Sequence, residues 1–264
     1  MKILFIGDVM GKPARKAVAT LLPKIKQEYE PDFIIANAEN LAHGKGITRQ
    51  TLDELLNAGV DFCTSGNHIW AKPEGHDILA QKNSPVIRPA NFPPNVPGSG
   101  AKLIPVGAHN ILVINLMGRV FMKEHLDCPF RKLDSILNEY KKEKPSAIII
   151  DFHAEVTSEK NTFGLYADGR VSAVLGTHTH IPTADERVLP KGTAYITDVG
   201  MVGLKNSSIG IAYEGILQTF LDQMPGKFEI PDHGLIFFNS VLLDIDTKDG
   251  HARSITRIQR DIEI

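Results

Sequence analysis

The sequence has little cysteine and no long hydrophobic run. Only Cys63 and Cys128 occur among 264 residues, which excludes a small fold held by disulfides and favours a reducing compartment. No stretch approaches the roughly 18 apolar residues of a membrane span. The apolar run at residues 3–6 is too short for a signal peptide. We therefore expect a cytoplasmic protein without a membrane partner.

An excess of charge of one sign is also missing. Lys and Arg total 29, Asp and Glu total 31, and the formal net charge is −2. The longest basic stretch, residues 141–144, is typical of a solvated helix end. These values argue against stable binding to nucleic acid through bulk electrostatics. Trp70, the only tryptophan, is expected to pack in the protein rather than to stack on a base.

Strand and helix patterns alternate through the first third of the chain. Strands are predicted at 2–6, 32–36 and 60–64, and helices at 15–29, 49–58 and 73–81. Thr48 is a suitable N-cap for the second helix, and Gly59 follows its end. Three β-loop-α units predict a parallel sheet with right-handed crossovers.

The rest of the chain is expected to complete one domain covering residues 1–264. Further strands are predicted at 111–116, 147–152 and 172–175, with a helix at 131–142. The segment 89–100 is rich in proline and glycine and is interpreted as an ordered surface loop. After residue 185 the pattern changes to short strands at 187–189, 194–197, 235–245 and 252–260 and a helix near 213–223. This change predicts a second, mixed sheet packed against the first.

Polar residues with metal-binding side chains follow or close five of the apolar runs. These clusters are Gly7-Asp8, residues 38–40, residues 64–68, residues 151–153 and residues 176–180. A lone histidine near a strand end is usually structural. However, ligand sites in parallel sheets lie at the carboxyl ends of the strands, so five such clusters predict one polar basin at a sheet edge.

The His178-x-His180 pair adds a geometric argument. Side chains alternate along an extended strand, so residues two apart point to the same face. If the strand ends at Gly176 and residues 178–180 stay extended, both imidazoles point at the same place. Imidazole and carboxylate groups are common ligands of zinc, iron and manganese, and the number of ligands predicts two metals.

The candidate ligands differ in type. Asp8 and Glu39 supply carboxylates, Asn67 supplies a neutral oxygen, and nitrogen comes from His153, His178 and His180. Two carboxylates and a bridging hydroxide would leave about one net positive charge on two divalent ions, which attracts a phosphate ester. Two metals about 3.5–4 Å apart can activate that hydroxide and stabilise charge on the phosphoryl oxygens. Phosphoester hydrolysis is the predicted reaction.

The order Gly-Asp, Gly-Asn-His, His, Gly-x-His-x-His resembles that of the calcineurin-like metallophosphoesterases. Within them, the chain is most similar to the YmdB-like bacterial phosphodiesterases. Long matching phrases lie at residues 38–46, 88–93, 151–155 and 191–201. The resemblance implies an α/β fold in which two mixed sheets are flanked by helices, a four-layer α/β/β/α sandwich.

The first two motifs depart from the superfamily pattern. The usual Asp-x-His is Asp8-Val9-Met10 here, and Glu39 stands where a bridging aspartate is usual. Both changes are shared with the YmdB-like subgroup, and Asn40 is placed to replace the missing histidine. The resemblance implies two ligand sets that share Glu39. Metal one would be held by Asp8, Glu39, Asn40 and His180, and metal two by Glu39, Asn67, His153 and His178.

Three further residues are candidates for supporting roles. His68 follows a ligand and, if the strand stays extended, faces away from it, so it is predicted to protonate the leaving group as general acid. Its alternative role is a structural hydrogen bond to a carbonyl. His43 is a candidate for substrate contact or for support of a ligand, against a default of surface loop. Asp198 is a candidate to orient a ligand histidine.

The resemblance also implies the substrate and the metals. It points to 2′,3′-cyclic nucleotides, to two divalent or mixed-valence ions, with iron or manganese favoured and zinc compatible, and to a homo-oligomer. Two alternatives stay open. One is a phosphomonoesterase acting on nucleotides or phosphoproteins, and the other is a regulatory binding protein whose turnover is incidental.

Overall fold

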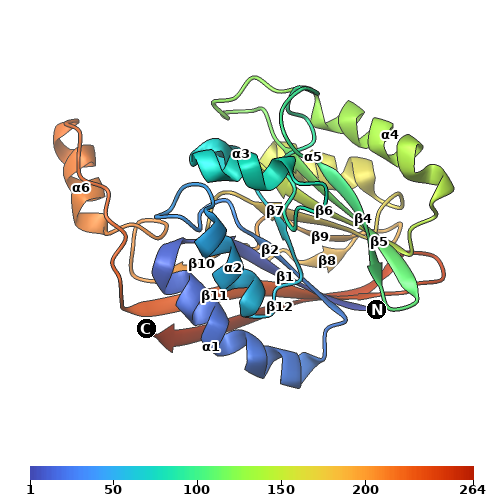
Figure 1. Ribbon diagram of the computed structural model, residues 1–264, viewed down its shortest axis with the longest axis horizontal. Coiled ribbons are helices and arrows are strands. Elements are labelled where there is room, and N and C mark those ends of the chain that lie inside the picture. Colours follow the sequence, from blue (N-terminus) through green and yellow to red (C-terminus); the bar gives the residue numbers. More distant parts are fainter.

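Two six-stranded sheets pack face to face with helices on both outer sides (Figure 1). The computed structural model describes all of residues 1–264. The first sheet has the order β12-β11-β10-β1-β2-β3 and the second β4-β5-β6-β7-β9-β8. This is the predicted four-layer α/β/β/α sandwich.

The first sheet combines both ends of the chain. Its strands are β1 (Lys2–Val9), β2 (Phe33–Asn37), β3 (Phe62–Thr64), β10 (Met201–Leu204), β11 (Leu235–Ile245) and β12 (Ala252–Glu263). Strands β1, β2 and β3 are parallel, as predicted, and β10 runs parallel to β1. Strand β11 pairs antiparallel to β1, β10 and β12.

The middle of the chain forms the second sheet. Its strands are β4 (Ala101–Val106), β5 (His109–Met117), β6 (Ala147–His153), β7 (Ala173–Thr177), β8 (Arg187–Val188) and β9 (Ala194–Ile196). Strands β5, β6, β7 and β9 are parallel, and β4 and β8 are antiparallel edges. The prediction that the strands after residue 185 build the second sheet was therefore wrong for β11 and β12, and β10 was not predicted. β10 and β11 pair with the edge of β1 opposite β2, and β12 pairs with β11.

Five of the six α-helices cover the outer faces of the two sheets, and α6 does not. They are α1 (Gly11–Tyr29), α2 (Arg49–Asn57), α3 (Pro73–Ala80), α4 (Pro129–Glu139), α5 (Thr157–Ala167) and α6 (Tyr213–Asp222). Short 3₁₀ helices occur at Asn67–Trp70 and Tyr140–Lys142. None of the helices combines the length and the apolar character that crossing a membrane requires.

Alternation along the strands assigns side chains to three apolar layers. Ile3 and Phe5 of β1 face the second sheet and pack with residues such as Ile149. Leu4 and Ile6 face the opposite way, against α1, α2 and α3. The outer face of the second sheet packs against α4 and α5 through Leu133, Ile136 and Phe163. The two sheets are thus held rigidly together below the ends of their parallel strands.

Helix α6 is different from the others, because none of its residues is buried. It stands away from the sandwich at the left of Figure 1. Leu217, Phe220 and Leu221 are exposed on it. The segments at its base return to the body of the protein, where Ile230 lies over Gly11 and Gly44.

Candidate metal centre

Strand ends from both sheets bring the predicted ligands together. Asp8 lies in β1, Glu39 and Asn40 follow β2, and Asn67 begins the 3₁₀ helix after β3. His153 is the last residue of β6, and His178 and His180 follow β7. The basin therefore lies between two sheets, and not at the edge of one sheet as the sequence suggested. Parallel strands of both sheets end here, which is where ligand sites are expected.

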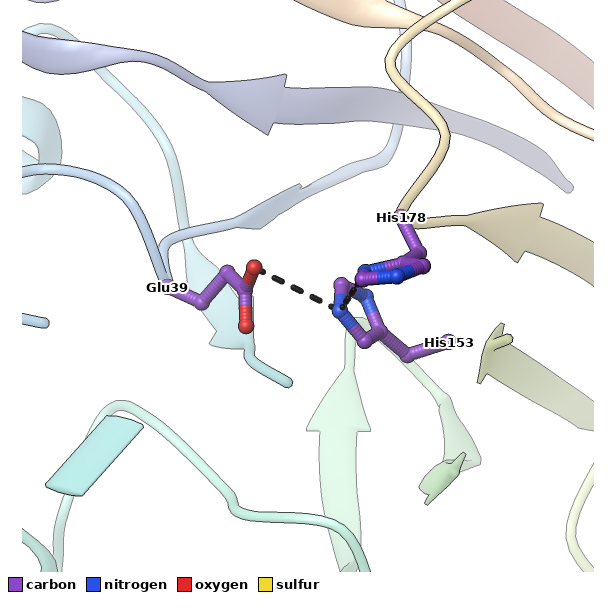
Figure 2. Close-up of side chains that lie close together, drawn as sticks. All are labelled: Glu39, His153 and His178. Atoms are coloured by element: carbon purple, nitrogen blue, oxygen red, sulfur yellow. Dashed lines mark hydrogen bonds and ion pairs between the residues drawn. The ribbon is translucent and has the colours of Figure 1, made fainter. Parts of the chain in front are cut away.

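Glu39, His153 and His178 form the tightest group. Their ligand atoms all lie within 4.8 Å of one another, and Figure 2 shows Glu39 and His178 directed at the ring of His153. Nε2 of His153 lies 3.4 Å from Oε1 of Glu39, 3.1 Å from Nδ1 of His178 and 3.0 Å from Oδ1 of Asn67. Four ligand-type atoms thus meet in a space where no apolar group separates them.

His180 and Asn40 are two further candidate ligands, and they contact each other. Nδ2 of Asn40 is 3.1 Å from Nε2 of His180. Nδ1 of His180 donates to the carbonyl of Ile209 at 2.9 Å, so Nε2 is the ring nitrogen that faces inward. Oδ1 of Asn40 is turned towards Nδ1 of His68, 3.0 Å away.

Asp8 presents a buried oxygen without a partner. Its Oδ2 accepts the N–H of His178 at 3.2 Å, but Oδ1 has no hydrogen bond and the side chain is fully buried. Burial raises the pKa of Asp8 above its usual value. An unpaired buried carboxylate oxygen is costly, and a cation beside it removes that cost. The site therefore fits a metal ion.

A hydrogen-bond chain fixes the orientation of His153. Thr177 donates its hydroxyl to Oδ1 of Asp151 at 2.6 Å, so its oxygen accepts from Nδ1 of His153 at 2.9 Å. Asp151 also accepts from Asn37 and Thr64 on its other oxygen. These partners direct Nε2 of His153 into the site, as supporting residues of metal-binding histidines usually do.

The pKa values of the two central histidines move in opposite directions. Burial alone would lower the pKa of His153, but the carboxylates of Glu39 and Asp8 outweigh it and raise this pKa to about 9. Burial and the charge of His153 lower the pKa of His178 to about 3. Nε2 of His178 donates to Glu155, 3.1 Å away. Nδ1 of His178 is therefore a neutral nitrogen ready to accept a cation.

The His-x-His segment does not continue the strand. Strand β7 extends to Thr177, and His178 and His180 have φ values of 98° and 67°. The expectation of extended residues 178–180 was wrong, because the chain turns sharply at these two residues. Both rings still enter the basin. Their backbones have left-handed conformations, which residues other than glycine rarely adopt.

His68 also departs from the extended geometry that was expected. It lies in the 3₁₀ helix, where its N–H donates to Oε2 of Glu39 at 3.0 Å. Its Nδ1 is 3.2 Å from Oε1 of Glu39 and its side chain is 32% exposed. The helix therefore turns the ring towards the ligands instead of away from them, and Nε2 is without a partner in the chain.

The two weaker candidates occupy different surroundings. Asp198 does not touch an imidazole; it accepts the N–H of Thr179, between the two histidines. His43 is exposed in the loop after Asn40 and lines a surface hollow of about 410 Å³ with Lys12 and Phe228. Asp151, Thr177 and Glu155 were not predicted as supporting residues. The spacing of Asp151 and His153, two residues apart on one strand face, was the available signal.

Comparison with known proteins is consistent with this geometry. The YmdB-like protein family matches residues 4–258. The chain belongs to this family. It is 47% identical over 258 residues, 98% of this chain and 96% of the relative, to a Bacillus subtilis (strain 168) protein named 2′,3′-cyclic-nucleotide 2′-phosphodiesterase.

Solved structures agree with the YmdB-like assignment. A Mycoplasma pneumoniae structure described as a novel phosphatase is 35% identical and covers 100% of this chain and 94% of its own, with a TM-score of 0.92. The 5′-nucleotidase precursor of Thermus thermophilus covers 100% of this chain and 54% of its own, at 11% identity and a TM-score of 0.60. The latter likeness shows the fold alone. The YmdB-like chain therefore has the calcineurin-like metallophosphoesterase fold.

Proposed function

We propose that this YmdB-like protein is a two-metal phosphodiesterase that hydrolyses 2′,3′-cyclic nucleotides. The observation that carries the proposal is that Glu39 of the first sheet meets the imidazoles of His153 and His178 of the second sheet. The name of the Bacillus subtilis relative, at 47% identity, supports the substrate class.

Glu39 is the residue that both metals share in this proposal. Asp8, Glu39, Asn40 and His180 would hold metal one, and Glu39, Asn67, His153 and His178 would hold metal two. The contact between Asn40 and His180 supports the first set, and the contacts of His153 with Asn67 and His178 support the second. Asn40 must rotate its amide to offer Oδ1, because that oxygen now faces His68.

Two bound ions would supply Lewis acidity and lower the pKa of a water towards about 7, which makes a nucleophile at neutral pH. The protein would set the charge of the site. Asp8 and Glu39 offset about half of the charge of two divalent ions, so a phosphodiester anion is attracted. Iron and manganese are the favoured metals and zinc is compatible, because the ligands mix nitrogen and oxygen.

His68 is proposed as the general acid. Oε1 of Glu39 lies 3.2 Å from its Nδ1, and its partly exposed ring leaves Nε2 free to meet a leaving-group oxygen. Opening a strained five-membered cyclic phosphate releases a sugar oxygen that needs one proton. A positioned imidazole can supply that proton at neutral pH.

A phosphomonoesterase is the second candidate function, supported by the description of the Mycoplasma pneumoniae structure as a phosphatase. The same ligands could bind the phosphate of a monoester. A regulatory protein with incidental turnover is a third possibility. The variant Glu39→Gln distinguishes a regulatory protein from an enzyme. It keeps the surface that a partner would bind but loses the carboxylate charge that hydrolysis requires.

The proposal is tested by removing and restoring the metals. Protein treated with chelator should not hydrolyse 2′,3′-cyclic AMP, and activity should return as about two equivalents of Mn²⁺ or Fe²⁺ are added. Glu39→Gln should bind fewer ions and stay inactive. Hydrolysis by metal-free protein would overturn the proposal, as would full activity of Glu39→Gln. Cytoplasmic location and homo-oligomer formation stay predictions, which fractionation and light scattering can check.

A further inference from the structure

Lys160 is a buried cation that the proposed reaction does not use. It lies on α5, and its side chain is only 1% exposed. Its Nζ donates to the carbonyl of Thr177 at 2.7 Å and to Oδ2 of Asp198 at 2.6 Å. A buried lysine is rare and normally requires such pairing.

Asp198, the partner of Lys160, binds the residue that follows His178. Its Oδ2 accepts the N–H of Thr179 at 3.1 Å and the hydroxyl of the same residue at 2.8 Å. Its Oδ1 accepts the N–H of Gly200 at 2.8 Å. Lys160 and Asp198 therefore fix the backbone immediately before and immediately after His178.

The segment that this pair holds is strained. His178 and His180 both have positive φ values, 98° and 67°, in a region that residues other than glycine rarely occupy. Such conformations persist only where the surroundings impose them. The N–H of Met201 bonds the carbonyl of His180 at 3.1 Å, but the backbone groups on both sides of His178 are held by Lys160 and Asp198.

We infer that the Lys160–Asp198 ion pair is a positioning device that holds His178 and His180 in their metal-binding conformations. This inference rests on the proposed metal centre. The pair touches no ligand side chain. It acts through the backbone of residues 177–179, which turns one imidazole towards Glu39 and the other towards Asn40.

Mn²⁺ binding to chelator-treated protein, measured by calorimetry, tests the inference. Lys160→Met should weaken binding by about 10–100-fold, as expected for residues that orient metal ligands. Asp198→Asn keeps an acceptor for Thr179 but removes the only charged partner of Lys160, and it should also weaken binding. Because both residues act through one device, the double variant should lose less affinity than the product of the two single losses.

Asp168→Asn is the matched control. Asp168 is also buried, and it accepts backbone N–H groups of Lys191 and Thr193 in a turn that carries no ligand. Asp168→Asn should lower the melting temperature and leave Mn²⁺ affinity unchanged. Wild-type affinity in Lys160→Met would overturn the inference, as would an equal loss in Asp168→Asn. If Lys160→Met does not fold, Asp198→Asn decides the question.

A second readout needs no metal. Amide hydrogen exchange at His178 and Thr179, whose N–H groups are hydrogen-bonded, should become faster in metal-free Lys160→Met and Asp198→Asn, and stay slow in Asp168→Asn. Unchanged exchange would contradict the positioning role. Failure of the wild-type protein to bind Mn²⁺ would instead count against the proposed function, while the exchange data would still report on the ion pair.

Discussion

At the scale of single residues, His153 is the centre of the site. It carries a raised pKa of about 9, so in the metal-free protein it holds a proton on Nε2 as well as on Nδ1. The Nε2 proton lies among Asn67, Glu39 and His178. That is the position a cation would take, and proton and metal therefore compete for one nitrogen.

This competition predicts the pH dependence of metal binding. His153 must lose its proton to bind a metal, so affinity should rise with pH and level off near pH 9. Below that value, each pH unit should weaken binding by about tenfold, because one proton is displaced. Calorimetry at pH 6 to 8, in buffers with different ionisation enthalpies, measures the protons released. Affinity that does not change with pH would contradict the assignment of His153 as a ligand.

His68→Ala tests the general acid at the same scale. The variant should lose about 10²–10⁴-fold in kcat on 2′,3′-cyclic AMP, because the leaving oxygen departs without a proton. Its metal content should equal that of the wild type. The kcat of the variant on a substrate with a nitrophenolate leaving group should fall much less, since that group needs no proton. His251→Ala, an exposed histidine beside Asp249, is the matched control. An equal loss on both substrates would indicate a structural role for His68.

The types of the ligands could be predicted from the sequence, but their orientation could not. Asp8, Glu39, His153 and His178 stand next to recognisable apolar runs. The groups that orient them could not be predicted. Ile209 binds the outer nitrogen of His180 from a segment without a motif. Glu155 lies in a matching phrase, but nothing in that phrase indicates its contact with the outer nitrogen of His178. The requirement for glycine at position 66 could not be predicted either. A Cβ there would lie 2.3 Å from both Glu39 Oε2 and His153 Nε2.

At the scale of elements, the site depends on the segment that comes after each strand. Helix α2 begins after the loop that carries Glu39 and Asn40, and its start is fixed by Thr48. The N–H of Thr51 donates to Oγ1 of Thr48, and the side chain of Thr51 bonds the N–H of Thr48 in return. This is the capping box whose first half the sequence predicted.

Thr48→Ala should therefore destabilise the protein by about 1 kcal/mol, because one donor of the first helical turn loses its partner. Urea unfolding of the metal-free protein measures this change. Thr20→Ala is the control, since the exposed Thr20 hydroxyl bonds only a carbonyl of its own helix and should leave stability nearly unchanged. Mn²⁺ affinity should be retained in both. Equal stability of the two variants would contradict the capping role.

The helices and strands with a clear apolar periodicity were predicted correctly. Those in which polar or small residues interrupt this periodicity were not. β1, β2, β3 and their helices were found to within a few residues. Helix α5 was missed because its inner face contains Lys160 and Gly164, which break the apolar pattern. The turn after β7 was missed because φ at two histidines is imposed by Lys160 and Asp198, both distant in sequence.

At the scale of the whole molecule, two sheets must close against each other before the site exists. Asp8, Glu39 and Asn67 belong to the first sheet, and His153, His178 and His180 to the second. The apolar layer between the sheets, which includes Phe5 and Leu175, sets their separation. The sequence predicted two packed sheets but not that β11 and β12 return to β1, because long-range pairing leaves no local signal.

The most direct measurement is steady-state hydrolysis by the metal-reconstituted protein of three substrates: 2′,3′-cyclic AMP, 3′,5′-cyclic AMP and a nitrophenyl monoester. We predict that the 2′,3′-cyclic diester is turned over with the highest kcat/KM, and that chelation abolishes this activity. A higher kcat/KM for the monoester would contradict the phosphodiesterase proposal and favour a phosphatase. Metal-loaded protein that hydrolyses none of the three would contradict the enzymatic function and favour a regulatory one.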